Sequence, residues 1–180
     1  MRTQAAHDRA IVDRAIVVMG VAGSGKSTLG AALARHFARE FRDGDSFHDI
    51  DNVAKMARGE PLTSADRGPW LDAIAAWLTA TPRGIVVCSA LAHSYRDCLR
   101  HAGPLLIIYL AITPSTARCR VANRQEHFMP VSLVDDQCAT LESPSSDERD
   151  VVQLDAEARL TVLIARALSA ITGARIPNTT

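Results

Sequence analysis

The stretch Gly20–Ser27, "GVAGSGKS", decides the fold. It fits the pattern G-x-x-x-x-G-K-[ST], in which the glycines let the backbone turn so that successive N–H groups face a phosphate. The β-branched run "RAIVVMG" at 14–20 precedes it, and a run with apolar residues at helical spacing follows it. A strand before the loop and a helix after it are the context that a P-loop requires, so the sequence predicts a P-loop protein.

The loop also predicts how a nucleotide and its metal are held. Lys26 should reach the β- and γ-phosphates, the Ser27 hydroxyl should take a place on Mg²⁺, and the backbone N–H groups should surround the phosphates. The predicted nucleotide-binding residues of the loop are Gly20, Val21, Ala22, Gly23, Ser24, Gly25, Lys26, Ser27 and Thr28.

Short β-branched runs alternate with longer helical stretches along the rest of the chain, which is typical of a parallel sheet covered by helices. The predicted strands are 14–20, 39–45, 84–90, 104–112 and 151–155, and the predicted helices are 26–40, 64–80, 93–103, 114–124 and 157–171. Ser64 is the expected N-cap of the second helix. We expect an α/β fold in a single domain over 1–180, with a core at about 14–172 and frayed termini.

Composition excludes several classes of protein. Twenty basic residues balance twenty acidic ones, so no overall charge favours nucleic acid or an anionic membrane. No apolar run approaches the roughly 18 residues that a membrane span needs. The first ten residues lack the apolar segment of a signal peptide, and the four cysteines form no CxxC pair. We therefore expect a cytoplasmic protein with reduced thiols.

The second predicted strand ends in "FRDGDSFH" (Phe41–His48), which places two carboxylates opposite the P-loop. The third strand ends in Cys88-Ser89, where many P-loop ATPases carry a metal-holding aspartate, so Asp43 and Asp45 are the available substitutes. A carboxylate here could also orient an acceptor hydroxyl and take its proton, which favours a small-molecule kinase. The alternative is a solvated turn, because Asp and Gly favour turns.

Several motifs together resemble the gluconokinase family over about Val17 to Asp155. They are "VVMGVAGSGKST", "DGDSFH", "KMARGEPLTSADRGPWL", "CSALAHSYRDCLR", "NRQEHFM" and "DQCATLESPSSDE". The resemblance implies ATP-dependent phosphorylation of the 6-hydroxyl of D-gluconate, with ATP and Mg²⁺ as cofactors. It also implies a homodimer and a fold similar to the nucleoside-monophosphate and shikimate kinases: a five-stranded parallel sheet with a short lid at about 120–132.

The resemblance assigns roles to the residues around the reaction. Lys26, Asp45 and Arg124 are the expected catalytic residues, with Asp45 holding and activating the hydroxyl, and Asp43 joins Ser27 near the metal. Arg120 and Arg124, four apart on a helix, should both reach the transferring phosphate. Two solvated arginines are the alternative. His127 and Phe128 belong to the same motif without a derivable role.

Gluconate is an anionic polyol, so its carboxylate calls for cationic side chains and its hydroxyls for mixed donors and acceptors. Within the matching motifs, Lys55, Arg67 and Arg96 are the candidates for the carboxylate, and His48 and Tyr95 for the hydroxyls. The alternatives are a surface charge for Arg67 and pairing with a nearby acid for Arg96.

The sequence departs from the family pattern at several positions near the expected site. Asp49 replaces a common proline, Glu126 a common glycine, and Ala92 and His93 replace frequent basic residues. Added negative charge could weaken gluconate or ATP binding, or shift preference to another sugar acid.

Two competing functions stay open: a kinase of another small hydroxy acid such as shikimate, and a non-catalytic module that binds ATP or a sugar acid. The intact Lys26, Ser27 and Asp45 argue against the second.

Overall fold

The computed structural model describes residues 13–123 and 131–173, and at its centre is a five-stranded, wholly parallel sheet. The strand order is β2-β3-β1-β4-β5. The strands are β1 (Ala15–Met19), β2 (Phe41–Asp43), β3 (Ile85–Cys88), β4 (Leu105–Ala111) and β5 (Val151–Asp155). All five predicted strands are therefore present, and the predicted α/β class is confirmed.

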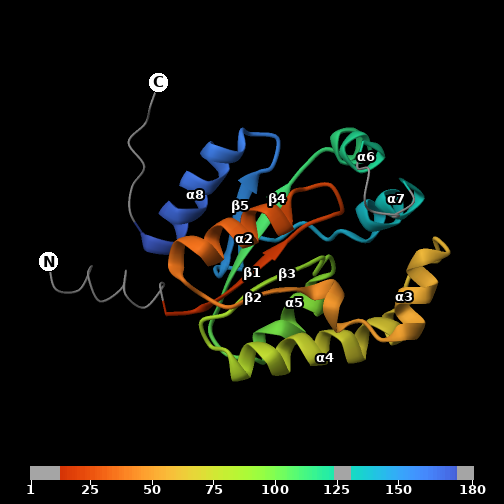
Figure 1. The fold of residues 1–180 in the computed structure, drawn as a ribbon, viewed down its shortest axis with the longest axis horizontal. Helices are drawn as coiled ribbons and strands as arrows, with labels where there is room; N and C mark the ends of the chain where they lie inside the picture. The colour runs from red at the N-terminus through yellow and green to blue at the C-terminus, as the bar shows by residue number, and fades with distance from the viewer. Residues whose placement is uncertain (1–12, 124–130, 174–180) are drawn as a thin grey trace, which may run out of the picture.

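Helices cover both faces of this sheet (Figure 1). Their bounds are α2 (Lys26–Phe37), α3 (Ile50–Ala57), α4 (Ser64–Ala80), α5 (His93–Arg100), α6 (Pro114–Ala122), α7 (Val131–Thr140) and α8 (Leu160–Thr172), with a short 3-10 helix, η1 (Gly44–Phe47), after β2. Helices α2 and α8 lie on one face and α4 and α5 on the other, whereas α3, α6 and α7 gather near the end to which the strands point (Figure 1).

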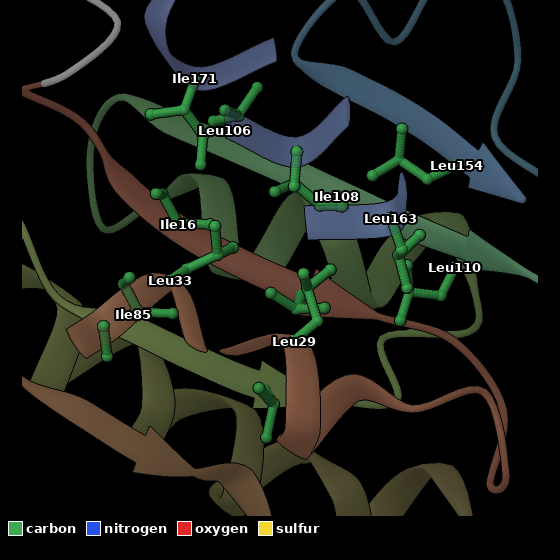
Figure 2. Packing of buried hydrophobic residues seen from close by; sticks show 14 of the residues in the cluster. Ile16, Leu29, Leu33, Ile85, Leu106, Ile108, Leu110, Leu154, Leu163 and Ile171 are labelled. Atoms are coloured by element: carbon green, nitrogen blue, oxygen red, sulfur yellow. The ribbon is translucent and has the colours of Figure 1, made fainter. Parts of the chain in front are cut away.

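The two faces bury separate hydrophobic clusters, because successive side chains of a strand point to opposite sides. Ile16 of β1 packs with Leu29 and Leu163 on the α2–α8 face (Figure 2). Its neighbour Val17 packs with Ile74 on the opposite face. This double burial explains why the central strands are continuously apolar in sequence.

The topology places a ligand site beside β1. After β1 the chain crosses one face of the sheet, through α2, to reach β2. After β3 it crosses the opposite face, through α5, to reach β4. Connections that diverge in this way open a crevice at the carboxyl ends of the strands, where α/β proteins bind ligands. The P-loop follows β1 directly and therefore stands at that crevice.

Three local features differ from the expected elements. Helix α3 was not predicted; its N-cap is Asp49, whose Oδ1 accepts the Asn52 N–H at 2.7 Å. Helix α7 was not predicted either. The cap of α4 is Thr63, not Ser64, because the Thr63 and Asp66 side chains bond reciprocally to each other's backbone N–H. A capping box satisfies two N–H groups at once, which a serine one residue later cannot do.

A buried ion pair fixes the connection between β3 and α5. Arg96 has no exposed surface, and its Nε and Nη2 each donate to a carboxylate oxygen of Glu148 at 2.7 Å. Its Nη1 donates to the carbonyls of Ala90 and Leu91 at 3.3 and 3.0 Å. Ala90 has a φ of +43°, which a residue with a side chain seldom adopts without support from its surroundings.

This arrangement corrects the expectation that Arg96 binds the substrate carboxylate. All of its donor groups point into the protein, towards Glu148 and the backbone. Arg100 adds a second cation, donating to Glu148 at 2.7 Å and to Asp150 at 2.8 Å. The alternative weighed from sequence, that Arg96 pairs with a nearby acid, describes the structure.

Replacement Glu148→Gln should lower the free energy of unfolding by about 3–5 kcal/mol, because it leaves the buried Arg96 charge without its counter-ion. Urea denaturation at pH 7 measures this loss. Hydrogen bonds from Arg96 lower the pKa of Glu148 to about 2, so its contribution is present above the ordinary carboxyl range. The difference between wild type and variant should therefore shrink as pH falls from about 4.5 towards 2.

Glu60→Gln is the matched control, since Glu60 also pairs with an arginine, Arg58, but both side chains are more than half exposed. Its unfolding midpoint should stay close to that of the wild type. Equal midpoints for Glu148→Gln and the wild type would contradict the structural role of the buried pair.

Candidate active site

A single pocket at the carboxyl ends of the strands brings most of the predicted site residues together. It is lined by the P-loop, the β2–η1 segment, the first turns of α4 and one side of α7. The predicted residues on its wall are Ala22, Gly23, Gly25, Lys26, Ser27, Asp43, Asp45, His48 and Arg67.

The glycines of the P-loop are required by backbone geometry. Gly23 has a φ of +81°, and a Cβ there would lie 2.7 Å from the carbonyl oxygen of Ala117. Gly20 has a φ of +143°, and its Cβ would lie 2.9 Å from the Leu110 carbonyl oxygen. The loop thus turns sharply while pressed against α6 and β4, in a conformation that residues with a side chain could not adopt at these two positions.

Lys26 folds back across this loop. Its Nζ donates to the carbonyl oxygen of Val21 at 3.0 Å, so the ammonium lies at the rim of the loop. Lys26 is also the first residue of α2, and the positive end of that helix dipole adds to the cationic character of the cradle.

Asp43 connects the P-loop to the opposite wall. Its Oδ2 accepts the Ser27 hydroxyl at 3.0 Å, and its Oδ1 accepts the N–H of Asp45 at 3.1 Å. The Ser27 hydroxyl and a carboxylate are both hard oxygen ligands, and here they stand beside a phosphate cradle. The pair therefore fits Mg²⁺, which prefers oxygen and binds through one or two protein groups together with phosphates and water.

No group of three or more His, Cys, Asp or Glu side chains within residues 13–123 and 131–173 could hold a metal by protein ligands alone. Nor does any helix in those ranges have the length and apolar character needed to cross a membrane.

Helix α4 holds the turn that carries Asp45 in place. Gly44 passes so close to β3 that a Cβ would lie 2.6 Å from the Val87 carbonyl oxygen. The indole Nε1 of Trp70 donates to the Gly44 carbonyl at 2.7 Å. Asp45 itself stays exposed on the pocket wall, and the 3-10 turn that holds it is bonded on both sides.

His48 lies flat on the same tryptophan. The rings of His48 and Trp70 stack with centroids 4.6 Å apart and planes 6° from parallel. Burial lowers the pKa of His48, so the imidazole is neutral at pH 7. Its buried Nδ1 has no hydrogen-bond partner among the described residues. The His48 ring lines the pocket, and a neutral imidazole suits a contact with a hydroxyl group.

Arg67 and Tyr95 lie together, but only Arg67 reaches the pocket wall. The Arg67 Nη1 donates to the Tyr95 hydroxyl at 3.3 Å, and its guanidinium carbon stands 5.6 Å from the centre of the tyrosine ring. Tyr95 therefore supports Arg67, where sequence reasoning expected a direct contact with the substrate.

Lys55 is not brought to this pocket. It forms a 2.6 Å ion pair with Asp66 and lines a separate hollow between α3 and α4. Bonds from Lys55 and Thr63 lower the pKa of Asp66 to about 2, which keeps this carboxylate ionised. The pair ties α3 to the first turn of α4, so Lys55 has a structural partner in place of the expected ligand.

Arg120 of α6 lies beside the P-loop. It donates to the Gly23 carbonyl at 3.4 Å and to the Ala156 carbonyl, just after β5, at 3.0 Å. Arg124, Glu126, His127 and Phe128 lie outside the described residues.

The departures from the family pattern that the structure describes have local roles. Asp49 caps α3, and the His93 Nδ1 lies 2.9 Å from an oxygen of Asp97. Neither residue lines the main pocket.

Sequence reasoning missed two residues of the site. Trp70 is buried in the core, and it also supports Gly44 and His48. Gln137 of α7 lines the pocket, and its Oε1 accepts the Ala22 N–H at 2.6 Å. The only sequence signal for Gln137 was its place in the motif "DQCATLESPSSDE", to which no role was given.

Comparisons with known proteins agree with this architecture. A family model described as shikimate kinase matches residues 22–164. The gluconokinase of Gluconobacter oxydans is 41% identical over 157 residues, covering 84% of this chain and 87% of that protein. The thermoresistant gluconokinase of Escherichia coli is 39% identical over 160 residues, covering 86% and 91%.

The solved structures extend the likeness to three dimensions. The crystal structure of a gluconokinase from Sinorhizobium meliloti superposes with a TM-score of 0.83 at 41% identity, covering 89% of this chain and 92% of that one. With a complete P-loop, a second wall built on the "DGDSFH" segment and relatives that match along almost their whole length, the chain belongs to the gluconokinase family of P-loop kinases.

Proposed function

We propose that this protein transfers the γ-phosphoryl group of ATP to the 6-hydroxyl of D-gluconate, giving 6-phospho-D-gluconate and ADP. The observation that carries the proposal is the single pocket that joins a complete P-loop to Asp45 and Arg67. Relatives named gluconokinase, at about 40% identity over most of the chain, support the choice of acceptor.

The donor half of the site holds the triphosphate. The N–H groups of the P-loop bind the phosphate oxygens, and Lys26 leaves the Val21 carbonyl to pair with the β- and γ-phosphates. Ser27 and Asp43 would hold Mg²⁺, which would supply positive charge beside the phosphates. Arg120, already at the P-loop, and Arg124 add positive charge, and a lid at about 120–132 excludes water.

The acceptor half supplies the base. As the 6-oxygen bonds to the γ-phosphorus, the bond from that phosphorus to the β–γ bridging oxygen breaks, and the hydroxyl proton passes to the Asp45 carboxylate. The hydrogen bond from the Asp45 N–H to Asp43 and the Trp70 bond to Gly44 hold this carboxylate in place.

Recognition of gluconate falls to Arg67 and His48. Arg67, oriented by Tyr95, pairs with the substrate carboxylate, and the neutral His48 ring bonds to a hydroxyl. The resemblance to gluconokinases further supports a cytoplasmic homodimer.

The direct test is a coupled ADP-release assay with ATP and Mg²⁺ and a panel of acceptors that includes gluconate, other sugar acids and shikimate. We expect gluconate to give the highest kcat/KM, and EDTA to abolish turnover. Folded protein that turns over shikimate or another acid in preference to gluconate would overturn the assignment of the acceptor. Folded protein that binds ATP but phosphorylates none of them would overturn the assignment as an enzyme.

Replacement Asp45→Asn should lower kcat about 10²–10⁴-fold, because an amide cannot accept the hydroxyl proton. The dissociation constant for ATP, measured by calorimetry, should change little. Asp51→Asn is the matched control, since Asp51 lies exposed on α3 and away from the main pocket wall. Activity of Asp45→Asn equal to that of the control would show that another group takes the proton.

A further inference from the structure

We propose that Gln137 is a catalytic residue whose side-chain NH₂ group binds the phosphoryl group during transfer. The inference rests on the proposed kinase function and adds to it a hydrogen-bond donor from α7, which comes after the expected lid in sequence.

The hydrogen bond to the P-loop fixes which way the Gln137 amide points. A backbone N–H can only donate, so the atom that lies 2.6 Å from the Ala22 nitrogen must be the amide oxygen. The NH₂ group is then the other end of a planar amide whose position is already set. Gln137 also lines the main pocket, so its side chain belongs to the wall that a bound nucleotide faces.

The position along the P-loop identifies which phosphate this NH₂ group would meet. Gln137 bonds to the N–H of Ala22, and Lys26 bonds to the carbonyl of Val21, the preceding residue. The Val21 carbonyl and the Ala22 N–H belong to one trans peptide unit and point in opposite directions, so the amide and the ammonium flank that unit on opposite sides. Both Lys26 and Gln137 nevertheless line the main pocket. Because the P-loop lysine reaches the β- and γ-phosphates, the part of the pocket that Lys26 and Gln137 share is the end at which the phosphoryl group is transferred.

A fixed hydrogen-bond donor in this part of the pocket suits phosphoryl transfer. The charge of the transferring group is spread over three equatorial oxygens, and Lys26 and the metal cannot contact all of them. A donor already held in place costs no reorganisation during the reaction, and removing one such donor lowers rates by about 10²–10³-fold in other enzymes.

Two variants separate donation from anchoring. Gln137→Glu keeps an oxygen for the Ala22 N–H but replaces the NH₂ donor by an anionic oxygen. Gln137→Met has similar length and removes both donor and acceptor without adding charge. Gln153→Glu is the matched control, because Gln153 is exposed on β5 and does not line the pocket.

Three quantities are measured for each protein: kcat with ATP and gluconate, the dissociation constant for ADP, and the dissociation constant for ADP with aluminium fluoride, which imitates the phosphoryl group in transfer. We expect both Gln137 variants to lose about 10²-fold in kcat and at least about 10-fold in affinity for the aluminium fluoride complex. Affinity for ADP alone and the melting temperature should stay near the wild-type values. Gln153→Glu should match the wild type throughout.

The inference is overturned if Gln137→Glu keeps wild-type kcat, or if both variants lose ADP affinity or melting temperature in proportion to activity, since Gln137 would then only anchor α7. Failure of the proposed function gives a different result: the wild type itself would not phosphorylate gluconate. The aluminium fluoride titration would still test Gln137 in that case, because ADP binding needs only the P-loop.

Discussion

The carboxylate of Asp43 is the contact on which the site depends, because it bonds to both walls at once. One oxygen accepts the hydroxyl of Ser27 in the P-loop, and the other accepts the N–H of Asp45. The distance between the phosphate cradle and the proposed base is thus set by one short side chain. A base positioned through its own backbone N–H is held more tightly than one at the end of a free loop. Catalysis requires such positioning, because the base must stay within hydrogen-bond reach of the reacting hydroxyl.

This contact forms only because the sheet delivers β2 and β1 to the same edge with β3 between them. The buried Arg96–Glu148 pair secures the next connection, where Ala90 adopts a positive φ directly after Ser89. Ser89 lines the pocket, and its carbonyl accepts the Gly20 N–H at 3.3 Å. The buried pair therefore supports the start of the P-loop, although neither Arg96 nor Glu148 lines the pocket.

The parts of this protein that a sequence reveals are those with a regular pattern. Buried strands are continuously apolar, and the P-loop needs glycines at positive φ, so both were predictable. Helix α3 was missed because it is only eight residues long, although Ile50, Val53 and Ala57 recur at helical spacing. The cation that faces the pocket was harder to predict, because Lys55, Arg67 and Arg96 all carry a positive charge that suits a substrate carboxylate. Only their partners in space, Asp66, Tyr95 and Glu148, show that Arg67 alone faces the pocket.

Trp70 has a consequence for how such a kinase can change its acceptor. Its indole N–H holds the turn of the proposed base, its ring supports His48, and Arg67 lies one turn earlier on the same helix. The residues proposed for acceptor recognition and for proton transfer therefore share one rigid support. Residues joined in this way do not contribute additively, so the effect of a substitution in α4 will depend on the residues present in η1. Adaptation to a new sugar acid along this lineage would then require paired changes in both segments, and single changes would lower the rate before they widened the choice of substrate.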